Sequence, residues 1–208
     1  MTDRHVTLYH MPHSRSTGVL TLLEELGADY QLEVLDIEKE EQRSEAYLAI
    51  NPLGKVPAVV HRGELITEQV ALYVFLADLY ADKGLAPSLD DPRRGPFLRW
   101  TAFYGSSFEP AVIDRAEERD PGPHARSPYG TFDGVIDLLD EHLSSHEYFL
   151  GDQFMALDVL WGSALRWTTG FGLVPKRASF VDYIERVTSR PAFARVAEID
   201  GVPTPPTG

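Results

Sequence analysis

The chain has 208 residues with 43% hydrophobic and 25% charged side chains, an ordinary balance for a globular protein of one large or two small domains. Its formal net charge is −13 and no run of Lys and Arg occurs, which argues against nucleic acid as a partner because phosphate binding needs a basic face. It contains no cysteine, which excludes disulfides, cysteine-ligated metals and a cysteine nucleophile.

The N-terminal segment carries no apolar stretch of signal-peptide length. No run of about 18 apolar residues, the length needed to span a bilayer, occurs elsewhere. We therefore expect a cytoplasmic protein without a membrane partner.

The first 80 residues alternate strand and helix patterns. β-rich segments predict strands over residues 5–11, 30–37 and 57–67, and the last of these holds two short strands around a turn at Arg62-Gly63. Apolar residues at helical spacing predict helices over residues 18–26 and 68–80, and residues 40–50 are a short polar helix candidate. The order β-α-β-α-β-β-α predicts an α+β domain with a mixed four-stranded sheet over residues 1–80.

Strand patterns stop after this domain. Residues 81–96 are rich in Gly and Pro and are interpreted as the linker and the start of the next domain. Aromatic residues then follow one helix face from Phe97 to Phe108, and further helix patterns cover 130–143, 156–170 and 180–198. Residues 97–208 are therefore predicted to form an all-α domain.

Four segments resemble the cytosolic glutathione S-transferase family, of the bacterial, serine type, in the family's order and over nearly the whole chain. They are LYHMPHSRSTGVLTLLEELG, INPLGKVPAVV, LITEQVALYVFLADLY and DQFMALDVLWGSALRW. The resemblance implies a thioredoxin-like N-terminal domain, an all-α C-terminal domain and a homodimer. It also implies glutathione as co-substrate, whose thiolate is added to a small apolar electrophile.

Ser14 lies between the first predicted strand and helix. By its place in the motif, the resemblance implies that Ser14 donates a hydrogen bond to the glutathione sulfur and so stabilises the thiolate. The backbone N–H groups around Arg15 and Ser16 could extend this anion site, with the Arg15 side chain as a cation near the thiolate or a carboxylate. The alternative is that Ser14 only caps the helix and that Arg15 is solvated. The Ser16 hydroxyl is expected to serve a backbone group and to be secondary to Ser14.

Lys55, Val56 and Pro57 form the second candidate group. The resemblance implies a cis bond before Pro57, which would aim the Val56 N–H and C=O at the cysteinyl backbone of glutathione. Lys55 could reach the glycyl carboxylate. The alternative is an ordinary proline at a strand start beside a solvated lysine.

Glu68 and Gln69 begin a predicted helix. The resemblance implies that the Gln69 N–H binds the γ-glutamyl carboxylate and that Glu68 binds the ammonium group. The alternative is that Glu68 only complements the helix dipole. The family usually has Ser where this chain has Gln69, which leaves the affinity for glutathione open.

Other residues are weaker candidates. His13 and Tyr104 are expected to line the electrophile pocket, although His13 could equally be a loop residue without a role. His142 and His146 lack a third ligand nearby, so no metal is expected. Asp158 is expected to retain half of a capping box, since Met155 cannot accept the reciprocal hydrogen bond.

Two other functions remain open: a glutathione-dependent isomerase or lyase on the same scaffold, and a non-catalytic interaction protein of this family. Retention of Ser14, Val56-Pro57 and Glu68 favours an enzyme.

Overall fold

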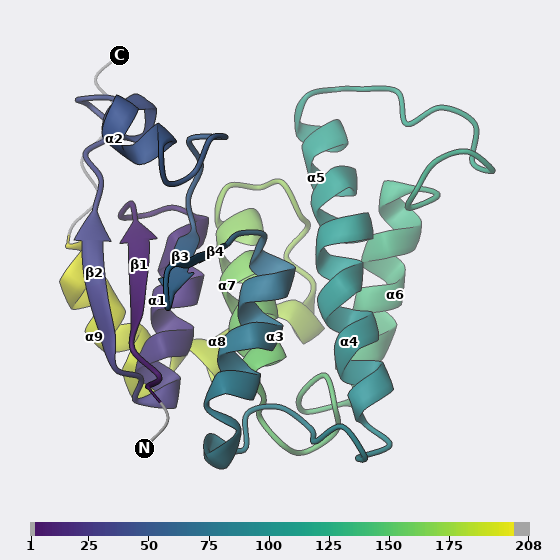
Figure 1. Ribbon diagram of the computed structural model, residues 1–208. Helices are drawn as coiled ribbons and strands as arrows, with labels where there is room; N and C mark the ends of the chain where they lie inside the picture. The colour runs from purple at the N-terminus through teal and green to yellow at the C-terminus, as the bar shows by residue number, and fades with distance from the viewer. Residues whose placement is uncertain (1–2, 202–208) are drawn as a thin grey trace. The chain divides into compact units, whose positions relative to one another are not determined.

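The computed structural model describes residues 3–201. They form two compact units (Figure 1). The sheet unit comprises the chain up to Lys83 together with the described residues from Arg190 onward, and the helical unit runs from Gly84 to Ser189.

The sheet unit is built on four strands in the order β2-β1-β3-β4. They are β1 (Val6–His10), β2 (Tyr30–Val34), β3 (Ala58–His61) and β4 (Glu64–Ile66). β1 runs parallel to β2 and antiparallel to β3, which in turn runs antiparallel to β4. The predicted mixed four-stranded sheet is confirmed.

Helix α1 (Arg15–Leu26) supplies the crossover that the parallel strands β1 and β2 require. Its apolar side chains are buried, and it ends at Gly27, whose φ of 55° suits the left-handed conformation. α1 packs against α3 (Gln69–Leu79) and α9 (Pro191–Asp200) in this unit. Three short helices complete it: η1 (Glu41–Arg43), α2 (Glu45–Leu48) and η2 (Ala81–Lys83).

Helix α9 departs from the predicted division of the chain. The sequence assigns residues 97–208 to the helical domain, but α9 lies in the sheet unit, with Val196 buried. Arg190 pairs with Glu25 on α1 at 2.7 Å, and Arg195 pairs with Glu24 at 2.7 Å. The segment predicted over 180–198 breaks before Pro191, since proline lacks an N–H and restricts the preceding residue.

The helical unit contains helices around an aromatic core, and the first three of them follow one another without a break. They are α4 (Arg94–Phe103), the π-helix η3 (Tyr104–Phe108), α5 (Glu109–Ala116), α6 (Phe132–Ser145), α7 (Ala156–Gly170) and α8 (Ala178–Thr188). The fully buried Trp161 contacts Trp100, Tyr104 and Phe108 edge-on. Within residues 3–201, none of the helices has the length and apolar character to cross a membrane.

Candidate active site at the start of helix α1

Ser14 is the N-cap of α1 and is half-buried. Its Oγ accepts the Ser16 N–H at 3.1 Å and donates to the Met11 carbonyl at 2.7 Å. The predicted capping role is therefore present. The same Oγ also lies 2.8 Å from the Ser16 Oγ, so it belongs to a larger hydrogen-bonded system.

Ser16 lies wholly inside the sheet unit. Its Oγ accepts the Met11 N–H at 3.0 Å, lies 3.0 Å from the Met11 carbonyl oxygen and lies 2.8 Å from Nδ1 of His10. The expected contact with a backbone group is thus present, and His10 is an additional partner. Of the two serines, only Ser14 has solvent-accessible surface.

His10 and Asp200 form a buried pair that the sequence analysis missed. His10 is fully buried at the end of β1, and its Nε2 lies 2.9 Å from Oδ1 of Asp200, whose side chain is 2% exposed. The other carboxylate oxygen accepts the Thr17 hydroxyl at 2.6 Å and the His13 N–H at 3.1 Å. We refer to His10, Ser16 and Asp200 as the buried network.

The electrostatics favour an ionised Asp200. Burial by itself raises the pKa of this carboxyl, but the hydrogen bonds from His10, Thr17 and the His13 backbone outweigh burial and hold the pKa below its usual value. An ionised carboxylate only accepts hydrogen bonds, so the Nε2 of His10 carries a proton.

The sequence pattern around His10 could have indicated that this histidine needs a buried polar partner. His10 shares the buried face of β1 with Val6 and Leu8, and a histidine on such a face needs polar partners. Its partner Asp200 lies 190 positions away on α9, and no local pattern links the two.

Arg15 and His13 are exposed on either side of Ser14. His13 has a φ of 58°, a left-handed conformation at the turn before α1. The side-chain amide of Gln69 donates to the Arg15 carbonyl oxygen at 3.3 Å. This contact brings the beginning of α3 next to the beginning of α1.

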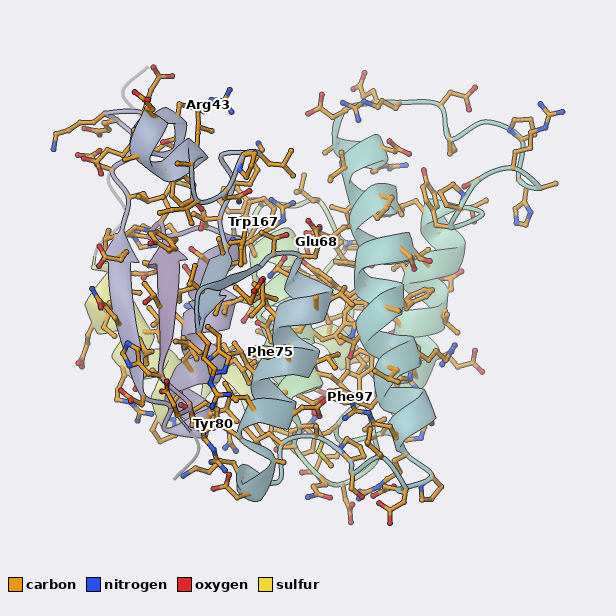
Figure 2. All side chains as sticks on the ribbon, in the orientation of Figure 1. Arg43, Glu68, Phe75, Tyr80, Phe97 and Trp167 are labelled. Carbon is orange, nitrogen blue, oxygen red and sulfur yellow. The ribbon has the colours of Figure 1, made fainter. Side chains whose placement is uncertain are left out.

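Glu68 is exposed at the N-terminal end of α3 (Figure 2). Its backbone has φ 63° and ψ 116°, outside the regions that a residue with a side chain prefers, and its carboxylate does not bond to the first turn of α3. Strained backbone of this kind, which costs about 1–3 kcal/mol, clusters at functional sites.

Residues 55–57 lie beside the end of β1. Tyr9 pairs with Ala58, so the antiparallel register carries Pro57 and Val56 toward the break that follows His10. The expected cis bond between Val56 and Pro57 is present. Lys55 is exposed, and its carbonyl oxygen accepts hydrogen bonds from Tyr47 at 2.6 Å and Asn51 at 2.8 Å.

Tyr104 belongs to the core of the helical unit. Its side chain is 4% exposed, its ring packs on Trp161 and Phe108, and its hydroxyl donates to Glu109 at 2.7 Å. It begins the π-helix η3, an irregularity that is frequent at functional sites.

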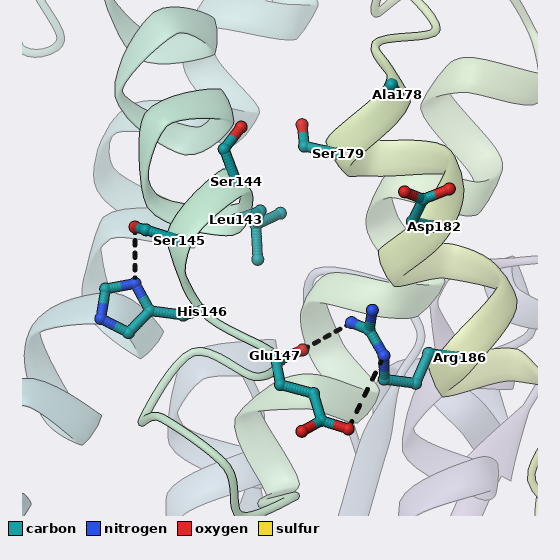
Figure 3. Close-up of a pocket in the computed structure, with 9 residues that line it drawn as sticks. All are labelled: Leu143, Ser144, Ser145, His146, Glu147, Ala178, Ser179, Asp182 and Arg186. Carbon is teal, nitrogen blue, oxygen red and sulfur yellow. Dashed lines mark hydrogen bonds and ion pairs between the residues drawn. The ribbon is translucent and has the colours of Figure 1, made fainter.

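A separate polar hollow of about 480 Å³ lies in the helical unit, between the end of α6 and α8 (Figure 3). Arg186 donates there to the Glu147 carbonyl oxygen at 2.7 Å. His146, considered above only as a metal ligand, lines this hollow, but none of the residues proposed to bind glutathione does.

Among residues 3–201, no group of three His, Cys, Asp or Glu side chains is placed to hold a metal ion. His142 and His146 stack with ring centroids 4.3 Å apart, and the His142 Nε2 bonds to the Phe149 carbonyl oxygen at 3.0 Å. Burial and the neighbouring His146 lower the pKa of His142.

Comparison with known proteins shows which family this chain resembles. Residues 4–78 match the family model for the glutathione S-transferase N-terminal domain. Glutathione S-transferase 3 of Zea mays is 25% identical over an alignment of 226 positions, which takes in 96% of this chain and 96% of its own.

Two solved structures agree over a similar span. A glutathione S-transferase from Xylella fastidiosa is 26% identical with a TM-score of 0.79, covering 96% of this chain and 100% of its own. A sphingomonad glutathione S-transferase in complex with glutathione is 26% identical with a TM-score of 0.78, covering 95% and 100%. These matches confirm the predicted thioredoxin-like N-terminal part and the helical C-terminal part.

Proposed function

This chain belongs to the cytosolic glutathione S-transferase family, and on that premise we propose that it adds the glutathione thiolate to a small apolar electrophile, with Ser14 stabilising the thiolate. The observation that carries the assignment of Ser14 is its place as a half-buried residue at the N-terminus of α1, beside a Ser16 that is wholly enclosed.

The chemistry needs a site that favours a sulfur anion. A free thiol has a pKa of about 8.5, so little thiolate exists at neutral pH. A hydroxyl donor and the positive end of a helix dipole both lower the pKa of a bound thiol. Ser14 provides the first and the N-terminus of α1 the second; its O–H would turn from the Met11 carbonyl to the sulfur.

The rest of glutathione is assigned to the neighbouring segments. The Val56 backbone before Pro57 would pair with the cysteinyl residue, and Lys55 would meet the glycyl carboxylate. The Gln69 N–H would bind the γ-glutamyl carboxylate and Glu68 its ammonium group. The contact between Gln69 and the Arg15 backbone supports this grouping, because it holds the starts of α1 and α3 together.

The electrophile pocket and the setting are also part of the proposal. Of the two residues expected to line the pocket, His13 is exposed beside Ser14 and stays in the proposal, whereas Tyr104 is enclosed in the aromatic core of the helical unit. The protein would act in the cytoplasm.

Turnover of a generic aryl halide with glutathione tests this function. Ser14→Ala should lower kcat by about 100-fold or more, on the scale of removing one donor to a developing anion. Ser14→Thr keeps the hydroxyl and should retain most of the activity.

Ser44→Ala is the matched control, since Ser44 is the N-cap of α2 and accepts the Tyr47 N–H at 3.2 Å. It should leave kcat unchanged. Equal losses in Ser14→Ala and Ser44→Ala would make Ser14 merely a helix cap.

The chain should also form a homodimer, as oligomers with closed two-fold symmetry are the commonest assemblies. Sedimentation equilibrium should give twice the 23.3 kDa of one chain at micromolar concentration. A species of the single-chain mass would contradict this.

A further inference from the structure

We propose that His10, held by Asp200, accepts the proton of the glutathione thiol through the hydroxyl groups of Ser16 and Ser14. This inference rests on the proposed function, because it assumes a thiol bound against Ser14. It adds a destination for the thiol proton and gives roles to two residues, His10 and Asp200, that do not touch the ligand.

The geometry provides an unbroken path of hydrogen bonds. From Ser14 Oγ to Ser16 Oγ is 2.8 Å, from Ser16 Oγ to His10 Nδ1 is 2.8 Å, and from His10 Nε2 to Asp200 Oδ1 is 2.9 Å. The path begins at Ser14, a half-buried residue, and ends at the Asp200 carboxylate, which is almost completely enclosed.

Donor and acceptor roles along the path follow from its ends. The ionised Asp200 only accepts, so it receives the proton of His10 Nε2, and the Nδ1 of a neutral ring must then accept. Ser16 donates its single hydroxyl proton to that Nδ1, and its Oγ accepts from Ser14 once the Ser14 O–H turns to it from the Met11 carbonyl. The Ser14 Oγ in turn accepts from the thiol.

Each proton then moves by one hydrogen bond. The thiol proton passes to Ser14, the Ser14 proton to Ser16 and the Ser16 proton to His10. The sulfur becomes an anion, both serines remain neutral hydroxyls, and His10 becomes a cation paired with Asp200. The net charge is unchanged, because one anion and one cation are formed. Each serine now carries the proton that it received from the side of the sulfur, so Ser14 donates to the thiolate.

The surroundings of His10 suit this role. Asp200 from α9 is the charged group in contact with the ring, while α1 contributes the neutral Ser16 and the neighbouring strand β2 places Val34 beside it. Two further donors, Thr17 and the His13 N–H, hold the other oxygen of Asp200 and fix the carboxylate. After the thiolate is consumed, the same path returns the proton to water at Ser14.

A proton count tests the path without relying on a variant. Glutathione is added to the protein in weak buffer at neutral pH, and an indicator dye reports released protons while ultraviolet absorbance reports the thiolate formed. S-methylglutathione, which has no thiol, gives the background to subtract. The proposal predicts far fewer released protons than thiolates formed, because His10 retains them.

Variants locate the acceptor. His10→Gln can still donate to Asp200 and accept from Ser16 but cannot take up a proton, so it should form less thiolate, release one proton for each, and lose about tenfold or more in kcat. Asp200→Asn should also form less thiolate, release one proton for each thiolate and lose activity. The matched control is Thr21→Val, which removes a buried hydroxyl of α1 that donates to the Thr17 carbonyl oxygen outside the path and should keep the proton count of the parent.

The outcomes separate this proposal from the function on which it rests. One released proton per thiolate in the parent, with thiolate formation still dependent on Ser14, would overturn the role of His10 alone. Absence of thiolate in the parent would overturn both.

Discussion

At the scale of single residues, Glu68 combines an unfavourable backbone conformation with an exposed carboxylate that is proposed to bind the glutathione ammonium group. Its φ of 63° and ψ of 116° are costly for a residue with a Cβ, while its carboxylate is exposed and makes no bond to the first turn of its own helix. The strained backbone thus presents a free carboxylate at the start of α3 without helping to cap that helix.

Glu68→Gly should therefore separate stability from binding. Glycine tolerates positive φ, so the free energy of unfolding should rise by about 1 kcal/mol. Loss of the carboxylate should weaken glutathione binding by about 1.5–3 kcal/mol, the value of a hydrogen bond to a charged group. Chemical denaturation and isothermal calorimetry measure the two effects.

Glu118→Gly is the control for the backbone effect. Glu118 also has positive φ, 52°, but lies in the helical unit, outside the proposed glutathione contacts. It should raise stability without changing affinity. A Glu68→Gly protein that binds glutathione like the parent would show that the γ-glutamyl group lies elsewhere.

At the scale of elements, helix α7 depends on one buried acid. Asp158 is fully buried; its oxygens accept the Met155 N–H at 2.8 Å, the Phe149 N–H at 3.0 Å and the Tyr183 hydroxyl at 2.8 Å. The half capping box expected from the sequence is present, and the other two bonds tie the helix to its surroundings.

Asp158→Ala should lower the free energy of unfolding by about 3 kcal/mol or more, because it leaves buried donors without an acceptor. Urea denaturation followed by circular dichroism measures this. Asp133→Ala, at an exposed position in the first turn of α6, is the control and should cost well under that amount. Equal losses would show that the buried bonds of Asp158 add nothing specific.

Helix α9 is attached to the sheet unit in a pH-dependent way. Because hydrogen bonds lower the pKa of Asp200 in the folded protein, its contribution to stability is fully present above its unfolded pKa of about 3.9 and is lost as the pH falls through the folded value. The stability difference between the parent and Asp200→Asn should therefore be constant near neutral pH and shrink below about pH 4. Urea midpoints measured across this range test it; a difference that grows on acidification would contradict the assignment.

For the molecule as a whole, the sequence predicted what local patterns encode and missed what the chain assembles at long range. Local sequence patterns were enough to predict the mixed sheet, α1 and the helices of the second unit. Nothing local indicates that α9 joins the sheet unit, since its partners Glu24 and Glu25 lie far away in the sequence.

The same limit applies to the site. The sequence indicated Ser14 because a hydroxyl at a strand-to-helix break is visible in it, and residues 55–57 and 68–69 because they form short motifs; the roles of these residues stay predictions. His10 and Asp200 were missed because their meaning depends on each other across 190 positions.

The most direct test of the central claim is a pH titration of the ultraviolet thiolate absorbance of bound glutathione. In the parent, the thiol pKa should lie about two pH units below its usual value near 8.5, corresponding to about 2.7 kcal/mol of differential stabilisation. Ser14→Ala should reverse much of that shift, and Ser44→Ala none of it. An ordinary pKa in the parent, or an identical titration in Ser14→Ala, would contradict the account.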